Sequence, residues 1–146
     1  MFQYQFKTWE QALPIAYPIR YKVFVIEQNI PDNLEIDEYD SLAEHLVLFF
    51  NELPIGTARI FVDNTEKVET LIIGRLAILA EYRARGLGKK MITYLITYAE
   101  KNFCKKLTLH AQAQTVPFYV KLGFVADSKE FVYDGIIHRK CTKFLV

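Results

Sequence analysis

The stretch "LIIGRLAILAEYRARGLGKKMITYLITYAEKN" (residues 71–102) decides how the middle of this chain folds. Its apolar beginning, with Thr70 in front of it, is typical of a strand at the centre of a sheet, buried on both faces. Apolar residues then recur at helical spacing and predict a helix over about residues 86–102; they are Leu87, Met91, Leu95, Tyr98 and Ala99. The stretch therefore predicts a strand, a loop with two glycines and a helix.

The loop "AEYRARGLGKK" (residues 80–90) has the features of a phosphate-binding turn. A helix N-terminus carries unpaired N–H groups and a partial positive charge, and glycine lets the backbone approach a ligand closely. Arg83 and Arg85 would add charged donors. A Walker loop needs Ser or Thr where this chain has Lys90, and a dinucleotide fingerprint needs Gly where it has Met91. The spacing thus excludes these two common phosphate loops.

Strands and short helices are predicted on both sides of this stretch. The expected strands cover residues 2–7, 45–51, 55–63, 70–79, 105–111, 124–133 and 136–146. Asp134-Gly135 indicates a hairpin, as does the short connection containing Pro54. Pro14 and Pro18 should interrupt the first helical region into a helix near residues 8–13 and another from about Pro18, and a further helix is expected at 115–123. This order predicts an α/β fold (α+β in some schemes), with a mixed, largely antiparallel central sheet of about seven strands and flanking helices.

The composition excludes several classes of protein. A chain of 146 residues fits one domain, so we expect a single domain over residues 1–146. The 18 Lys and Arg residues balance 17 Asp and Glu residues, which leaves no overall field to attract nucleic acid. Nothing resembles a signal peptide or approaches the ~20 apolar residues of a membrane span. We expect a cytoplasmic protein with no metal and with neither a nucleic acid nor a membrane as partner; Cys104 and Cys141 are read as reduced thiols.

Residues 32–44 hold six acidic residues and no basic one. Such a run could attract a cationic amine substrate, or it could be a solvated loop that balances the basic part of the chain. We favour the solvated loop, since charge runs usually face water.

Two motifs give the chain a resemblance to a known family. Arg83-x-x-Gly86-x-Gly88, after a strand and opening a helix, resembles the acetyl-CoA loop of the GNAT N-acetyltransferases, and "FYVKLGF" (118–124) resembles their second signature. Further segments are similar to the ElaA-like branch of the family; they are "RYKVFVIEQNI" (20–30), the acidic run ending in His45, "IIGRLAI" (72–78), "HAQAQTVPFYVKLGF" (110–124) and "YDGIIH" (133–138). The resemblance implies a GNAT-like acyl-CoA acyltransferase fold and an N-acetyltransferase.

The resemblance also implies where acetyl-CoA binds. The backbone N–H groups of the loop would hold the CoA pyrophosphate, while the pantetheine arm would pair with the end of the preceding strand, which splays away from the next one. The implied cofactor-binding residues are Ala77, Ile78, Leu79, Arg83, Ala84, Arg85, Gly86, Leu87, Gly88, Lys89 and Gln112.

For catalysis the resemblance places Tyr119 at the position of the general acid that protonates the CoA thiolate. Glu27 is the favoured general base, and His45 and His138 are the runners-up, because neutral imidazole titrates near working pH. His110 could also face the slot. For the base, direct action and action through water both stay open, and neither cysteine suggests a covalent acyl-enzyme.

The function expected from these residues is transfer of an acetyl group from acetyl-CoA to a primary amine of a small molecule or a protein, by direct transfer in a ternary complex. A non-catalytic acyl-CoA-binding or sensor module is the first alternative, and an α/β interaction domain whose glycines only turn the chain is the second. The acceptor cannot be read from the sequence, and the resemblance is consistent with a homodimer.

Overall fold

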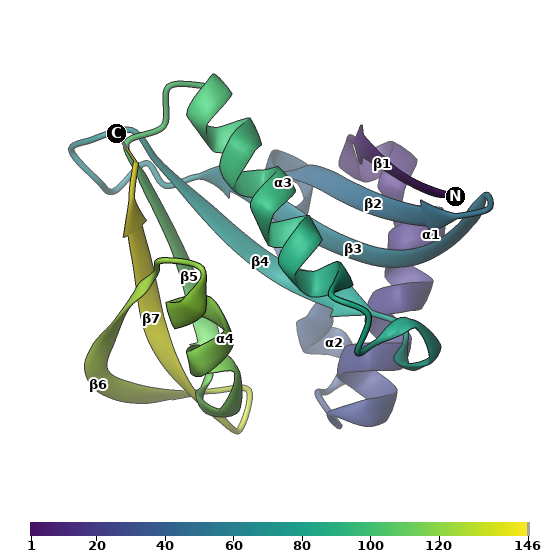
Figure 1. Ribbon diagram of the computed structural model, residues 1–146. Helices are drawn as coiled ribbons and strands as arrows, with labels where there is room; N and C mark the ends of the chain where they lie inside the picture. The colour runs from purple at the N-terminus through teal and green to yellow at the C-terminus, as the bar shows by residue number, and fades with distance from the viewer. Residues whose placement is uncertain (146) are drawn as a thin grey trace.

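The computed structural model describes residues 1–145, which form one seven-stranded sheet with helices on both faces (Figure 1). The strands are β1 (Phe2–Lys7), β2 (Glu44–Phe50), β3 (Leu53–Val62), β4 (Thr70–Ile78), β5 (Lys106–Gln112), β6 (Val125–Tyr133) and β7 (Ile136–Phe144). Their spatial order is β1-β2-β3-β4-β5-β7-β6; β4 and β5 run parallel, and all other neighbours are antiparallel. The predicted α/β fold with a mixed, largely antiparallel sheet is confirmed.

The helices form two layers around the sheet. They are α1 (Trp9–Arg20), the π-helical η1 (Tyr21–Glu27), α2 (Asp32–Glu35), α3 (Leu87–Lys101) and α4 (Val116–Lys121), with single 3-10 turns η2 (Asp40–Leu42), η3 (Ala80–Tyr82) and η4 (Ala113–Thr115). In Figure 1, α3 and α4 lie in front of the sheet and α1 lies behind β2 and β3. Side chains of β2 alternate between the layers, because successive residues of a strand point to opposite faces. Leu46 and Leu48 join the main core, whereas Val47 packs in a smaller cluster with Ala12 and Ala16 of α1.

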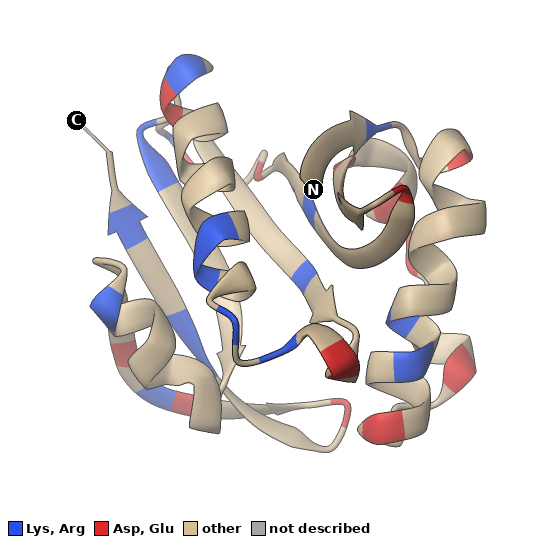
Figure 2. Ribbon diagram, turned by 45° about the vertical axis from the view of Figure 1, so that its right-hand side comes forward, with Lys and Arg blue, Asp and Glu red and all other residues tan. Residues whose placement is uncertain are grey.

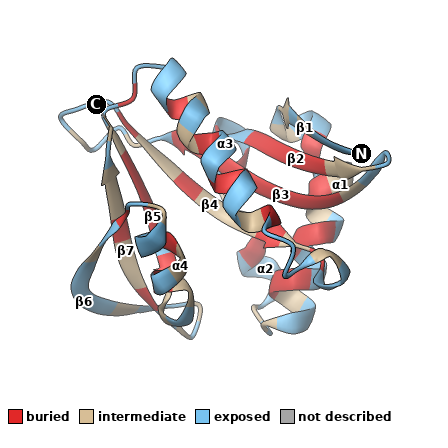
Figure 3. Cartoon of the chain, viewed as in Figure 1, coloured by how far each residue is buried: buried red, intermediate tan, exposed pale blue. Residues whose placement is uncertain are grey.

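The expected break in the first helical region is wrong. Residues 9–20 form one continuous α-helix that contains both Pro14 and Pro18. Both prolines lie on its exposed side, where water can bond the carbonyl groups left without an N–H partner. The opposite side, with Ala12, Ala16 and Ile19, is buried and holds the helix together; Figure 3 shows both buried and exposed residues along α1. The chain then widens into η1, which ends at Glu27.

Both predicted hairpins are confirmed, but one differs in its turn. Asn51 and Glu52, with φ of 47° and 72°, join β2 to β3, so Pro54 lies inside β3 and not in the connection. Proline is tolerated there because the β2–β3 register shifts next to it, opposite Phe49. Asp134-Gly135 makes the other turn, between β6 and β7.

A slot opens at the centre of the sheet because β4 and β5 pair only along their first halves. Thr70–Ile73 lies against Lys106–Leu109, and beyond these residues the two strands diverge into a V (Figure 1). The β3–β4 register also shifts between Thr57 and Arg59, near Arg75, which has a φ of 52°. A bulge of this kind bends its strand. The slot therefore lies between the carboxyl ends of two parallel strands, in front of the N-terminus of α3.

Candidate active site

A cleft of about 840 Å³ occupies the slot between β4 and β5 and continues across the sheet. Its lining comes from η1, β3, β4, β5, α4 and β7, so residues far apart in the sequence meet there. Predicted site residues among them are Glu27, Ala77, Ile78, Arg83, Gln112, Tyr119 and His138. The fold thus brings three of the four predicted catalytic residues and four of the eleven predicted cofactor-binding residues to one cavity. The residues that do not line it are His45, Leu79, Ala84, Arg85, Gly86, Leu87, Gly88 and Lys89.

The glycine loop brings the N-terminus of α3 beside this cleft, since an added Cβ at Gly88 would stand 3.5 Å from Phe118 and 3.8 Å from Ile78, which line it. Ala84 and Gly86 have φ of 63° and 74°, which turns the chain sharply before the helix begins at Leu87. The N–H group of Lys90 donates to the carbonyl oxygen of Gly86 at 3.2 Å, so the N–H groups before it are the unpaired ones of the first turn. No heavy atom lies within 4 Å of where a Cβ of Gly86 would stand. Figure 2 shows basic residues along this loop and the start of α3, which suits an anion.

Of the three predicted residues at the end of β4, only Ile78 presents its peptide groups to the slot. The Leu79 N–H donates to the Ile55 carbonyl at 2.9 Å, and the Leu79 carbonyl accepts from the Tyr82 N–H, also at 2.9 Å. Ala77 is paired with Thr57 of β3. Because peptide groups alternate in direction along a strand, the N–H and carbonyl of Ile78 point away from β3 and toward β5.

Arg83 lies against the strand and η1. Its Nε donates to the Ile78 carbonyl at 2.9 Å, and its Nη1 and Nη2 each lie 2.8 Å from an oxygen of the Glu27 carboxylate. Arg85 donates to the Glu81 carbonyl at 3.3 Å and stacks over Tyr82. In the structure both predicted phosphate-binding arginines are therefore engaged with the protein itself.

Tyr119 lies on α4, with 8% of its surface exposed, and lines the cleft. The rings of Phe118 and Phe124 pack edge-on against it, with centroids 5.0 and 5.8 Å away. Burial, and to a smaller degree Cys141, raises the pKa of the Tyr119 hydroxyl well above its usual value. The side chain is thus held in place as a neutral hydrogen-bond donor.

Glu27 and two of the histidines reach the cleft. His138 is buried, and its Nδ1 lies 2.7 Å from the Ile136 carbonyl; since a carbonyl only accepts, Nδ1 carries the proton and Nε2 is left as the basic nitrogen. His110 packs edge-on against Phe131. Glu27 and His138 therefore both line the cleft, Glu27 with its carboxylate tied to Arg83.

His45 lies outside the residues that line the cleft. It is 1% exposed, its Nε2 lies 2.8 Å from the Asp40 carbonyl, and its ring packs on Trp9 at 4.9 Å. Burial lowers the pKa of His45, so its ring is neutral and donates to the carbonyl. This environment is that of a structural histidine.

Gln112 connects β5 to η1 across the mouth of the slot. Its Nε2 donates to Oε1 of Gln28 at 2.7 Å, and its Oε1 accepts from Gln114 at 2.9 Å. An amide that bridges the slot in this way is placed to contact a molecule that lies between the two strands.

The interpretation of residues 32–44 as a solvated loop is wrong for its central part. Glu35 and Asp40 are 1% and 0% exposed. They and Asp37 form buried or half-buried ion pairs with three arginines, which the sequence reasoning did not connect with them: Arg20, Arg59 and Arg75. The signal that could have found these partners is arginine within otherwise apolar runs, since a buried guanidinium needs a carboxylate. The acidic run therefore closes the floor of the cleft, to which Glu35 and Asp37 contribute.

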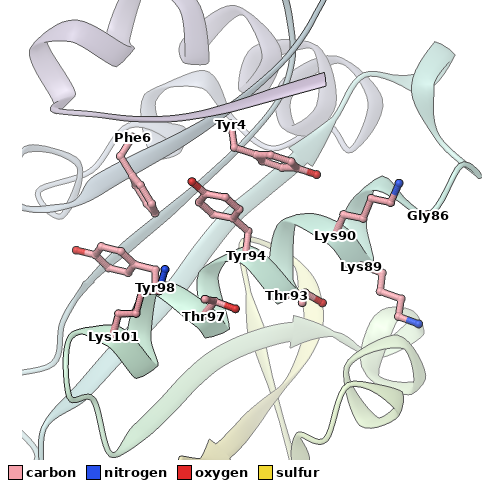
Figure 4. A pocket seen from close by; sticks show the side chains of 10 residues that line it. All are labelled: Tyr4, Phe6, Gly86, Lys89, Lys90, Thr93, Tyr94, Thr97, Tyr98 and Lys101. Atoms are coloured by element: carbon pink, nitrogen blue, oxygen red, sulfur yellow. The ribbon is translucent and has the colours of Figure 1, made fainter. Parts of the chain in front are cut away.

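A second hollow, of about 830 Å³, runs along the outer side of α3 (Figure 4). Tyr4 and Phe6 of β1 form one side and Tyr94 and Tyr98 of α3 the other. The Tyr4 and Tyr94 rings stack on one another with centroids 4.8 Å apart. This groove meets the glycine loop at Gly86 and Lys89, but it contains none of the predicted catalytic residues.

Within residues 1–145, no three His, Cys, Asp or Glu side chains come together as metal ligands would. Over the same part of the chain, no helix has both the length and the apolarity needed to cross a membrane.

Comparisons with known proteins assign the chain to a protein family. A family model described as "Acetyltransferase (GNAT) domain" matches residues 12–144. A Bacillus subtilis (strain 168) protein named an acetyltransferase is 40% identical over 140 residues, which cover 93% of this chain and 92% of that protein. The uncharacterized N-acetyltransferase YjcF of the same organism is 37% identical over 92% of this chain and 94% of its own length.

Solved structures agree with this assignment. Escherichia coli ElaA is 27% identical, with a TM-score of 0.83 over 98% of this chain and 99% of its own. An acetyl-CoA-bound GNAT family acetyltransferase from Elizabethkingia anophelis, at 19% identity, shares the fold, with a TM-score of 0.75 over 99% of this chain and 98% of its own.

Proposed function

Because the chain belongs to the GNAT acetyltransferase family of acyl-CoA-dependent acyltransferases, we propose that it is an N-acetyltransferase that uses acetyl-CoA. The acceptor is a primary amine of a small molecule or a protein, and the acetyl group passes to it directly in a ternary complex. Cys104 and Cys141 are both buried and outside the residues that line the cleft, which supports direct transfer over a covalent acyl-enzyme.

One observation carries this proposal: three features suited to acetyl-CoA lie close together. Ile78 and Tyr119 line the slot, and the N-terminus of α3 lies beside it, where Gly88 approaches Ile78. The N-terminus of α3 suits the pyrophosphate. The slot-facing peptide groups of Ile78 suit the amides of the pantetheine arm. Tyr119, from the opposite wall, offers a neutral donor to the thioester end. The open space at Gly86 supports the fit, because a side chain there would stand over the helix end.

In the proposed reaction the neutral amine nitrogen attacks the thioester carbonyl carbon, so that a C–N bond forms and the C–S bond breaks. The nitrogen loses a proton to a base, and the sulfur leaves as a thiolate that takes a proton from solvent water to become the CoA thiol. Burial holds the pKa of Tyr119 above its usual 10.0, while a thiol has a pKa of about 8.5. Complete transfer of the phenolic proton is therefore uphill, and we assign Tyr119 the task of stabilising the leaving sulfur by a hydrogen bond.

Glu27 is the base that we propose, acting through water, with His138 as the alternative. Glu27 lies at the end of η1 that faces the slot. Arg83 contacts both the Glu27 carboxylate and the Ile78 carbonyl, so these two groups lie near each other. In His138 the Nδ1–H group donates to the Ile136 carbonyl, which leaves Nε2 as the nitrogen that can accept a proton. His45 is not favoured, because it is buried outside the cleft lining.

Two measurements test the function. Calorimetric titration with acetyl-CoA should show saturable binding at one site per chain, and release of CoA thiol should require an amine from a panel of small primary amines and peptides with free amino groups. Saturable binding without transfer to any amine would favour a non-catalytic acyl-CoA-binding module. Absence of binding would overturn both readings of the site.

A further inference from the structure

Arg83 joins three parts of the slot in a single arrangement. Its side chain leaves the glycine loop, bonds the edge of β4 through Nε and holds the end of η1 through both terminal nitrogens. The two contacts to Glu27 form a parallel fork, the geometry that a planar guanidinium makes with a carboxylate.

This arrangement occupies two groups that acetyl transfer needs. The Ile78 carbonyl points into the slot and accepts the Arg83 Nε–H, so an amide N–H of a ligand must share this oxygen with the guanidinium. Both oxygens of Glu27 lie 2.8 Å from terminal nitrogens of Arg83, so an amine or a water must compete with the guanidinium for them. The contacts of one side chain thus occupy a binding group and a catalytic group together.

The arrangement is weak enough to be reversed. Arg83 and Glu27 are 41% and 37% exposed, and an ion pair of that exposure is worth about 0–1 kcal/mol. A pyrophosphate at the N-terminus of α3 would lie next to the loop that carries Arg83, and it offers a guanidinium the same forked contact with more charge.

We propose that Arg83 is exchanged between Glu27 and the cofactor phosphate, so that binding of acyl-CoA itself releases the Ile78 carbonyl and the Glu27 carboxylate. The proposal rests on the proposed function. Glu27 first competes with the cofactor phosphate for Arg83, and it acts on the acceptor amine only after Arg83 has left it. Coupling between two sites is reciprocal, so acyl-CoA and the acceptor amine should each strengthen the binding of the other.

The competition predicts an unusual result: removing a charge from a proposed catalytic residue should tighten cofactor binding. Glu27→Gln keeps the shape of the side chain but weakens its hold on Arg83, and the dissociation constant for CoA should fall by about 2- to 5-fold, which is the ion-pair energy expressed as affinity. Glu81→Gln is the matched control, because it removes one carboxylate from the same loop, and no hydrogen bond or ion pair of its side chain is present within residues 1–145.

Calorimetric titration with CoA, which needs no turnover, measures these effects. We expect Glu27→Gln to bind CoA more tightly than both the wild type and Glu81→Gln, and the gain to disappear when Arg83→Gln is also present. Equal affinities in Glu27→Gln and Glu81→Gln, or a persisting gain in the double variant, would overturn the exchange while leaving the proposed function intact. Absence of saturable CoA binding in the wild type would instead overturn the proposed function and the exchange with it.

Discussion

Burial changes what the Tyr119 hydroxyl can do. A phenol in an apolar setting loses the ability to ionise, because its charged form is poorly solvated, but it keeps its ability to donate a hydrogen bond. The rings of Phe118 and Phe124 create this setting and also fix the direction of the side chain. Tyr119 is therefore better suited to bind a developing negative charge than to give up its proton completely.

Tyr119→Phe should lower kcat by about 100-fold, at the weaker end of what a positioned proton donor contributes. The KM for acetyl-CoA should stay within about 2-fold, because the hydroxyl acts on the leaving sulfur and not on the bound thioester. Steady-state kinetics with a responsive amine checks both. Tyr98→Phe is the control, since it removes a half-buried hydroxyl on the other side of α3, in the groove of Figure 4. An unchanged kcat in Tyr119→Phe would contradict its assignment.

Asp40→Asn should lower the free energy of unfolding by about 3–5 kcal/mol, because it removes the buried carboxylate that Arg20 and Arg59 share and leaves each with one partner, Glu35 or Asp37. Asp40 accepts from Arg20 at 2.8 Å and from Arg59 at 2.9 Å, and it is fully buried. Denaturant unfolding measures the loss. Glu38→Gln, an exposed acid of the same run, should change stability by less than about 0.5 kcal/mol. Equal effects of the two variants would rule out a structural role for the buried pairs.

Motifs name candidate site residues but do not give their orientation. Tyr119 and Arg83 follow from motifs, and both line the cleft, whereas Gly86 of the same loop lines the other hollow. It could not be predicted that Ile78 rather than Leu79 faces the slot, since that depends on the register with β3. Arginine within apolar runs indicates that buried guanidinium groups need carboxylates, but which carboxylates of residues 32–44 pair with which arginine depends on the fold and leaves no local pattern.

At the scale of elements, the bulge in β4 and the loop before α3 both use backbone in the left-handed region. Arg75 has a φ of 52°, and its Nη2 donates to the Glu35 carbonyl at 2.8 Å, so its side chain ties α2 to the bent strand. Gly86 has a φ of 74° at the start of α3. The bend in β4 widens the slot, and the turn at Gly86 directs the N-terminus of α3 toward it.

Gly86→Ala should weaken CoA binding by about 10-fold or more, because the residue either strains the left-handed turn or shifts the N–H groups of α3. The matched control is Gly135→Ala: Gly135 has a φ of 76°, and it too has no heavy atom within 4 Å of an added Cβ. Both variants should lose about 1 kcal/mol of stability. Calorimetry with CoA should separate them, and equal CoA affinities would show that the turn at Gly86 serves folding alone.

The sequence predicted the strands and the long helix because their apolar periodicity is local, and their positions in the chain are confirmed. It failed for α1, where prolines were expected to break the helix. Packing decided that case: the buried side with Ala12 and Ala16 holds the helix, while Pro14 and Pro18 face water. Propensity alone could not reveal which side would be covered.

At the scale of the whole molecule, buried charges tie the first helix to the centre of the sheet. Arg20 of α1, Arg59 of β3 and Arg75 of β4 converge on three carboxylates of the segment between η1 and β2. Trp9 adds its ring beneath the Arg20 guanidinium. The stability of the fold should consequently depend on pH over the range in which these groups titrate.

Stability should fall in two steps as the solution is acidified. Burial lowers the pKa of His45 below 6.5, so from about pH 6.5 downward the unfolded chain binds a proton that the folded chain excludes. Arg20 and Arg59 outweigh burial and lower the pKa of Asp40 from 3.8 to about 2. Between about pH 4 and 2 this second step removes on the order of 2 kcal/mol.

Thermal unfolding followed from pH 8 to pH 2 measures both steps. His45→Gln, whose amide can still donate to the Asp40 carbonyl, should flatten the first step and keep the second. A Tm that stays constant from pH 7 to pH 5 in the wild type would contradict the role given to His45.

The short parallel pairing of β4 and β5 has a mechanical consequence. Strands β1–β4 come from the first part of the chain and β5–β7 from the last, and the only ladder between these groups within residues 1–145 runs along Thr70–Ile73 and Lys106–Leu109. Such a seam can act as a hinge, since a small rotation about it changes the width of the V without breaking a strand pairing on either side. The thickness of acyl chain that the slot admits should then depend on the stiffness of this hinge as much as on the residues that line the cleft.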